Sequence, residues 1–221
     1  MLPGPILLLL LCQTSAFTIE AAPPQVIPET ARSLLGPKAF IVADGKKVVF
    51  RMWKLDIWRS NAEPEQLVNG LTLKELEPGQ TLGWIELPFP LSDFRGRQVD
   101  AGIFSVRFGV QPASDDHNDS SPAPYFAVLT PPGNERWNQS LSMEDLLTEG
   151  KKILPRHPAI FLLYPLTKGP GIKKGGMPLW LMPSQGIGAL AWPQMVEANG
   201  QKGILGAALV IKGISPAVKN P

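Results

Sequence analysis

The densest group of side chains that could do chemistry is the run 115–119, Asp-Asp-His-Asn-Asp. Carboxylate and amide oxygens are calcium ligands, and an imidazole among carboxylates could instead hold a transition metal. The spacing fits neither the EF-hand calcium loop nor a zinc signature. Asp, Asn, Ser and Pro also form ordinary solvated turns. We therefore expect a polar loop without a metal, in which Asp115, Asp116, His117 and Asp119 are candidate binding residues.

His157 is the other candidate, because the chain has only two histidines. It lies between Arg156 and Pro158 at the start of an apolar run. A hydrolase could bring His117 and His157 together with a nearby carboxylate, as general acid–base catalysis requires. A histidine in such a place more often hydrogen-bonds to nearby backbone. The positions of the two imidazoles in a structure would separate these alternatives.

Motifs that are diagnostic of catalysis are missing from the sequence. It contains no Gly-x-Ser-x-Gly elbow and no His-Glu-x-x-His pair, and the Gly- and Lys-rich stretch 168–176 lacks the ending of a phosphate-binding loop. Cys12 is the only cysteine and lies in an apolar leader, so the mature chain has no thiol for a disulfide or a zinc site. No cofactor is predicted.

Carbohydrate is one candidate ligand. Trp137, Trp180 and Trp192 lie near Pro and Gly, and an exposed indole can stack on a sugar ring, although core packing is the commoner fate. Asp56, Glu86 and Asp93 could supply a glycosidase pair, but the distance between the carboxylates decides that reaction and the sequence does not give it. We expect a non-catalytic binding protein, with an envelope hydrolase that uses His117 and His157 as the alternative.

The first residues have the pattern of a secretory signal. The run 6–11 is apolar throughout and is followed by polar residues and then Ala16. It is too short to span a bilayer, which takes about 20 apolar residues, but it suits the h-region of a signal peptide. The n-region has no Lys or Arg. We predict a signal peptide at 1–16, with cleavage no later than residue 22, and a secreted or periplasmic protein of the cell envelope.

Length and composition predict one domain. The chain has 221 residues, of which 44% are hydrophobic, and this is enough for a single well-buried core. We expect a spacer at 17–37 and one β-rich domain at 38–221, with no transmembrane span in the mature chain. The net charge is +2 without a continuous basic run, which argues against nucleic acid as a partner. The partner is otherwise unknown.

Short β-branched and aromatic segments predict the strands. Asp44-Gly45 is a hairpin signal between 40–42 and 46–59. The alternation changes phase at Met52-Trp53, so either a bulge lies there or both faces of the strand are covered. The run 104–110 alternates apolar residues with Ser105, Arg107 and Gly109, which predicts a half-buried strand. The remaining strands are expected at 81–89, 124–130, 159–164 and 204–212.

One helix has a clear start signal. Ser142 is followed three positions later by Asp145, the pattern of a capped helix that ends near Gly150, and a weaker helical turn lies at 30–35. Many short strands without a βαβ rhythm predict a mainly β fold. We expect an antiparallel β-sandwich, jelly-roll-like or immunoglobulin-like, with one or two short helices.

Three motifs carry a resemblance. They are the run 78–83 (Pro-Gly-Gln-Thr-Leu-Gly), the triplet 93–95 (Asp-Phe-Arg), and the strand 101–112, which ends in Gly-Val-Gln-Pro. They resemble a family of secreted bacterial proteins of unknown function, in which such a strand enters a polar loop with a His and a later His-Pro opens another strand. His117 and His157-Pro158 are the counterparts here. The resemblance covers roughly half of the chain and implies export and a β-rich fold, without a catalytic residue.

Overall fold

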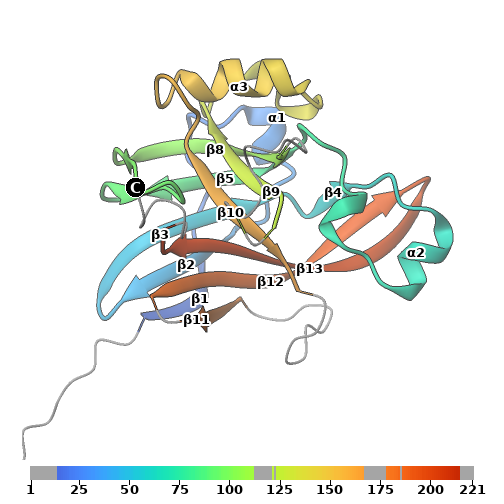
Figure 1. The fold of residues 1–221 in the computed structure, drawn as a ribbon, viewed down its shortest axis with the longest axis horizontal. Coiled ribbons are helices and arrows are strands. Elements are labelled where there is room, and N and C mark those ends of the chain that lie inside the picture. Colours follow the sequence, from blue (N-terminus) through green and yellow to red (C-terminus); the bar gives the residue numbers. More distant parts are fainter. Residues whose placement is uncertain (1–13, 112–120, 122, 167–177, 185, 215–221) are drawn as a thin grey trace, which may run out of the picture.

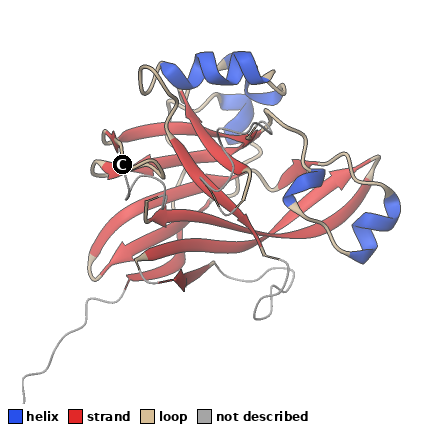
Figure 2. Ribbon diagram, viewed as in Figure 1, coloured by secondary structure: helices blue, strands red, loops and turns tan. Residues whose placement is uncertain are grey.

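Strands dominate the computed structural model, which describes residues 14–111, 121, 123–166, 178–184 and 186–214 (Figure 2). The predicted mainly β fold with short helices is confirmed. Among the described residues, no helix is both long and apolar enough to cross a membrane.

In the described part of the chain, eleven strands form one continuous sheet (Figure 1). Neighbours along it are antiparallel, apart from the parallel pair β4–β12. The order is β1 (Thr14–Glu20), β2 (Lys38–Asp44), β3 (Lys47–Lys54), β5 (Thr81–Leu87), β8 (Gly102–Val110), β9 (Tyr125–Thr130), β10 (Ile160–Pro165), β13 (Gln201–Lys212), β12 (Ile187–Ala198) and β11 (Leu179–Ser184), with β4 (Ile57–Arg59) beside β12. A separate small hairpin consists of β6 (Leu91–Ser92) and β7 (Gln98–Val99).

The sheet curls into a half-barrel, so that its first strands face its last strands across the core (Figure 1). The two end strands, β1 and β11, lie beside each other. Phe40 of β2 packs edge-on against Trp192 of β12, with 6.0 Å between the ring centres. The sandwich type expected from the sequence is not confirmed, because alternation within a strand sets which face is buried and leaves open whether the strands join into one sheet or two.

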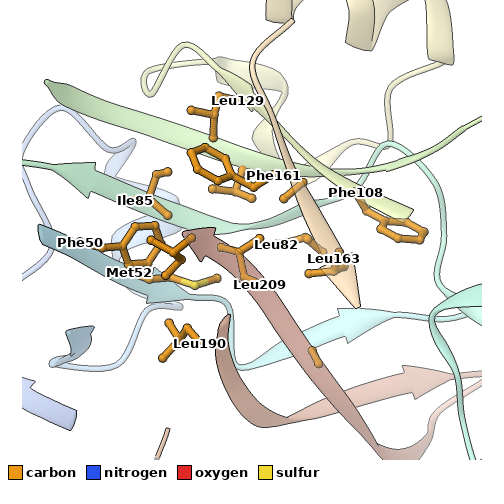
Figure 3. Packing of buried hydrophobic residues seen from close by; sticks show 14 of the residues in the cluster. Phe50, Met52, Leu82, Ile85, Phe108, Leu129, Phe161, Leu163, Leu190 and Leu209 are labelled. Carbon is orange, nitrogen blue, oxygen red and sulfur yellow. The ribbon is translucent and has the colours of Figure 1, made fainter. Parts of the chain in front are cut away.

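The main core lies inside this curl. Phe50 and Met52 of β3, Ile85 of β5, Phe161 of β10 and Leu209 of β13 converge there (Figure 3). Each is at most 1% exposed, and burying a side chain of this size stabilises the fold by about 1.5–3 kcal/mol.

The helices lie outside the sheet. Among the described residues they are α1 (Glu29–Arg32), α2 (Pro64–Asn69) and α3 (Met143–Lys151), with short 3-10 turns η1 (Leu73–Glu75) and η3 (Glu135–Asn138). The predicted start of α3 is confirmed, because the Ser142 hydroxyl accepts a hydrogen bond of 3.1 Å from the Asp145 N–H. The helix buries Leu146 and packs on β8 and β9.

The predicted hairpin is confirmed as β2 and β3. The phase change at Met52-Trp53 reflects cover on both faces, since both residues are buried and their pairing with β5 runs without a break. The bulge of this hairpin lies instead at Val49 of β3, the extra residue opposite the consecutive pair Val42 and Ala43.

The prediction that 104–110 is half-buried is wrong. Ser105 and Arg107, on its expected solvent face, are 1% and 0% exposed. The carbonyl groups of Pro131 and Arg136 accept hydrogen bonds from these two side chains, so the segment that follows β9 covers this face.

Residues 17–37, expected to be a spacer, are folded against the sheet. β1 pairs with β2 along its whole length. Ile27, Ala31 and Leu35 form a second buried cluster with Trp53 and Trp84. Residues 1–13 of the predicted signal peptide lie outside the described residues.

Candidate functional site

His157 lies beside an ion pair that fixes the local backbone. Arg97 donates hydrogen bonds to the carbonyl groups of His157 (2.7 Å) and Pro158 (2.5 Å). Its guanidinium also contacts the Asp93 carboxylate at 2.7 Å, and Asp93 is fully buried. The imidazole of His157 is exposed, whereas its main chain is part of this clamp.

The candidates Asp115, Asp116, His117 and Asp119 lie outside the described residues. Their convergence with His157 therefore remains a prediction. Within the ranges that the structure describes, no cluster of three His, Cys, Asp or Glu side chains could hold a metal ion.

Two of the acids considered for a glycosidase are already engaged in ion pairs. Asp93 pairs with Arg97, and Glu86 pairs with Arg51 at 2.7 Å. Asp56 belongs to neither pair; it lines a hollow on another part of the surface.

This hollow is a large concave feature of the described surface. Two adjoining cavities of about 730 and 800 Å³ share Gly36, Pro37, Asp56 and Ile57, and together we call them the groove. The second of these cavities is lined by residues of β2 and β3 and by residues of β12 and β13. Each cavity lies within the range of small-molecule sites, roughly 300–1,000 Å³.

The groove has two ends, which differ in their lining. The Lys54 end is lined by Phe40, Lys54, Met195 and Ile204 among others. The Trp137 end is lined by Leu34, Arg59, Gln80 and Trp137 among others.

A buried glutamine holds the floor of the groove in place. The Gln194 amide N–H₂ donates to the carbonyl groups of Leu55 (3.1 Å) and Asp56 (3.0 Å). The Gln194 carbonyl oxygen accepts a hydrogen bond of 3.1 Å from the Trp192 indole. Together with the parallel pairing of Ile57 and Met195, these bonds fix the turn from β3 to β4 against β12.

Two arginines hold the wall at the Trp137 end. Arg59 donates to the Asn138 carbonyl group (2.7 Å) and the Ser140 hydroxyl (2.8 Å). Arg107 donates to the carbonyl groups of Gln139 and Arg136, each at 2.9 Å. The segment 136–140, which carries Trp137, is therefore bound from two strands.

The charges of the groove belong mainly to its Lys54 end. The Lys54 side chain is 20% exposed, and its ammonium lies 3.7 Å from a carboxylate oxygen of Asp56, which is 71% exposed. Burial lowers the pKa of Lys54, and the charge of Asp56 opposes this change. At the other end Arg59 pairs with Glu77 at 2.6 Å.

Apolar side chains remain exposed around the groove. Leu34, Ile57 and Ile204 line it and are 54%, 37% and 39% exposed. Trp137 is partly exposed there, with its indole N–H donating to the Thr30 hydroxyl at 3.1 Å. A concave apolar surface with a few charged groups is the usual form of a ligand site.

The sequence did not indicate the groove. Lys54 ends a strand in which both faces are covered, and Gly36-Pro37 looked like the end of a spacer. Of the three tryptophans considered for carbohydrate, Trp192 is 1% exposed and belongs to the core, and Trp180 packs against that core. Trp137 lines the groove.

Comparisons of the chain with protein-family models, with curated proteins and with solved structures give no match.

Proposed function

We propose that this chain is an exported, non-catalytic β protein that binds a small ligand in the groove. The observation that carries the proposal is the exposed apolar lining of Leu34, Ile57 and Ile204 in a cavity of ligand size. In this proposal the two facing halves of the curled sheet act as the layers of a sandwich-like scaffold, and the ligand covers the apolar surface left at their junction.

The charged groups support binding over catalysis. Lys54 already faces Asp56, and Arg59 already bonds Glu77, Asn138 and Ser140. Through these contacts the charged groups hold the walls of the groove in position. A general acid or base must instead reach the proton of the substrate that it transfers.

Export is supported by the leader pattern and is compatible with the fold. Cleavage after Ala16 leaves Phe17–Glu20 of β1, which pair with Lys38–Ile41 of β2. Sequencing the amino terminus of the protein isolated from its native envelope fraction is expected to give Phe17. A cytosolic protein that retains its leader would contradict export.

A substitution at Gly36 tests the groove. A Cβ at Gly36 meets no atom within 4 Å, so Gly36→Trp is expected to fill the groove without disturbing the fold. Gly133, where a Cβ makes one contact of 3.5 Å, provides the control Gly133→Trp. We expect compounds from a small-molecule panel to raise the melting temperature of the wild type and of Gly133→Trp by mass action, but not that of Gly36→Trp. Compounds that stabilise all three proteins alike, or a panel without effect, would contradict the proposal.

Carbohydrate is a second candidate ligand, favoured by Trp137. Its partly exposed ring lies beside Arg59 and Asn138, which supply polar groups near an apolar face. Saccharides in the same panel test this candidate. Trp137→Ala is expected to abolish their effect if the ring stacks on sugar, and an unchanged response would exclude stacking.

A further inference from the structure

The Lys54 end of the groove is apolar on both of its long walls. Phe40 from β2 lies on one side, and Met195 from β12 and Ile204 from β13 lie on the other. Ile204 remains 39% exposed within the described structure. A ligand that covers these side chains gains hydrophobic free energy in proportion to the apolar area removed from water.

The charges at this end favour an anion. Lys38, Lys54 and Asp56 are the ionisable residues that line it, so its formal charge is positive. Lys38 also lies 3.5 Å from Glu20, where both side chains are more than half exposed. Such an exposed ion pair contributes little to stability, and it leaves the Lys38 ammonium available to a second acceptor.

Lys54 is the cation best placed to bind a ligand. Its side chain is mostly buried, and its contact with Asp56 at 3.7 Å is longer than a charge-assisted hydrogen bond. The Asp56 side chain is largely in water, so it compensates only part of the burial of the ammonium. A ligand carboxylate would supply a closer partner.

The backbone of β12 disfavours a peptide strand as the occupant. β11 pairs with β12 up to Ala191, and β4 pairs with it from Met195 onward. Between them, Pro193 has no N–H, and the side chain of Gln194 bonds the β3–β4 turn. Since proline cannot donate to a ladder, an added strand would lose a bond here.

We propose that the Lys54 end of the groove binds a small amphiphile, with the carboxylate head of the ligand at the Lys54 ammonium and its apolar chain against Phe40, Met195 and Ile204. This assignment rests on the proposed binding function and gives it a ligand class. The head group sets the orientation of the ligand, and the apolar walls supply most of the affinity.

Three probes of equal chain length test the head group: decanoate, decanol and decylamine. Calorimetry with the purified chain is expected to rank decanoate first. Lys54→Met keeps most of the length of the side chain without its charge and is expected to weaken decanoate binding about tenfold or more, the size of one lost charge-assisted bond. It is expected to leave decanol binding unchanged, which shows that the groove is intact. Lys54→Arg is expected to retain decanoate binding.

Lys151→Met, on the exposed surface of α3, is the control and is expected to bind decanoate like the wild type. The assignment is overturned if Lys54→Met binds decanoate as tightly as the wild type, if decylamine binds better than decanoate, or if no probe binds. Should other compounds still stabilise the wild type and not Gly36→Trp, only the ligand class fails. Should none do so, the binding function fails with it.

Discussion

Arg107 is a fully buried cation whose hydrogen-bond acceptors are main-chain oxygens. Its guanidinium donates to the carbonyl groups of Gly79 (2.8 Å), Gln139 (2.9 Å) and Arg136 (2.9 Å). Burial, reinforced by the nearby charge of Arg136, lowers the pKa of Arg107 to about 10. The fold thus uses a costly desolvated charge to tie three points of the chain together.

Arg107→Met removes these bonds and keeps most of the side-chain volume. Hydrogen bonds to a charged group contribute about 1.5–3 kcal/mol each, while the desolvation of the buried cation costs several kcal/mol and disappears with it. Gly79 and Arg136 also accept backbone N–H groups from Leu141 and Gln139, so their oxygens keep a partner. We therefore expect a net loss of about 2–4 kcal/mol in the free energy of unfolding.

Urea unfolding of the wild type, Arg107→Met and Arg107→Lys measures this loss. An ammonium lacks the planar fork that spans three carbonyl groups, so Arg107→Lys is expected to be at least as destabilised as Arg107→Met. Arg51→Met, which breaks a partly exposed ion pair with Glu86, is the control and is expected to cost about 1 kcal/mol or less. Wild-type stability in Arg107→Met or Arg107→Lys would refute the reasoning.

Three further predictions concern the backbone, a buried ion pair and pH. Gly79→Ala is expected to lower the free energy of unfolding by about 3 kcal/mol or more, because φ is +78° and the added Cβ would lie 1.9 Å from a carbonyl oxygen. Gly200 has φ +77° but open space around it, so Gly200→Ala is expected to cost only about 1 kcal/mol in the same unfolding assay. Asp93→Asn is expected to cost about 3 kcal/mol, because it leaves Arg97 without its buried carboxylate, and an unchanged melting temperature would contradict this role. The pKa of Lys54 is lower in the folded protein than its ordinary value of 10.5, so between these two pKa values the unfolded chain binds more protons than the folded chain. The free energy of unfolding of the wild type, relative to that of Lys54→Met, should therefore rise with pH across this window. A fall with pH would contradict the assigned direction of the pKa change.

Local signals in the sequence predicted the local structure well. Asp44-Gly45 and Ser142 act through bonds and dihedral angles within a few residues, and the hairpin and α3 lie where these residues indicate. The cover on each face of a strand comes from segments distant in sequence. This is why Arg107 was expected at the surface and is buried, and why Met52 and Trp53 are both apolar and buried without a bulge between them.

The groove could not be predicted for the same reason. Its walls come from the turn at Gly36, the end of β3 at Lys54, the segment around Trp137 and the middle of β12. These residues meet only because the sheet curls, and the curvature of the sheet cannot be predicted from the spacing of residues along the chain. Of the residues singled out for chemistry, His157 proved to lie beside a backbone clamp, and the cluster 115–119 lies outside the described residues.

The segment 136–140 is hydrogen-bonded by two arginines, and this affects how a ligand can be recognised. Arg59 and Arg107 anchor it from separate strands, and Trp137 is further fixed by its bond to Thr30. This wall is therefore preorganised: a ligand that enters does not have to order a loop, and little conformational entropy is lost on association. Binding to such a rigid wall favours ligands whose shape already fits over those that need the protein to adapt.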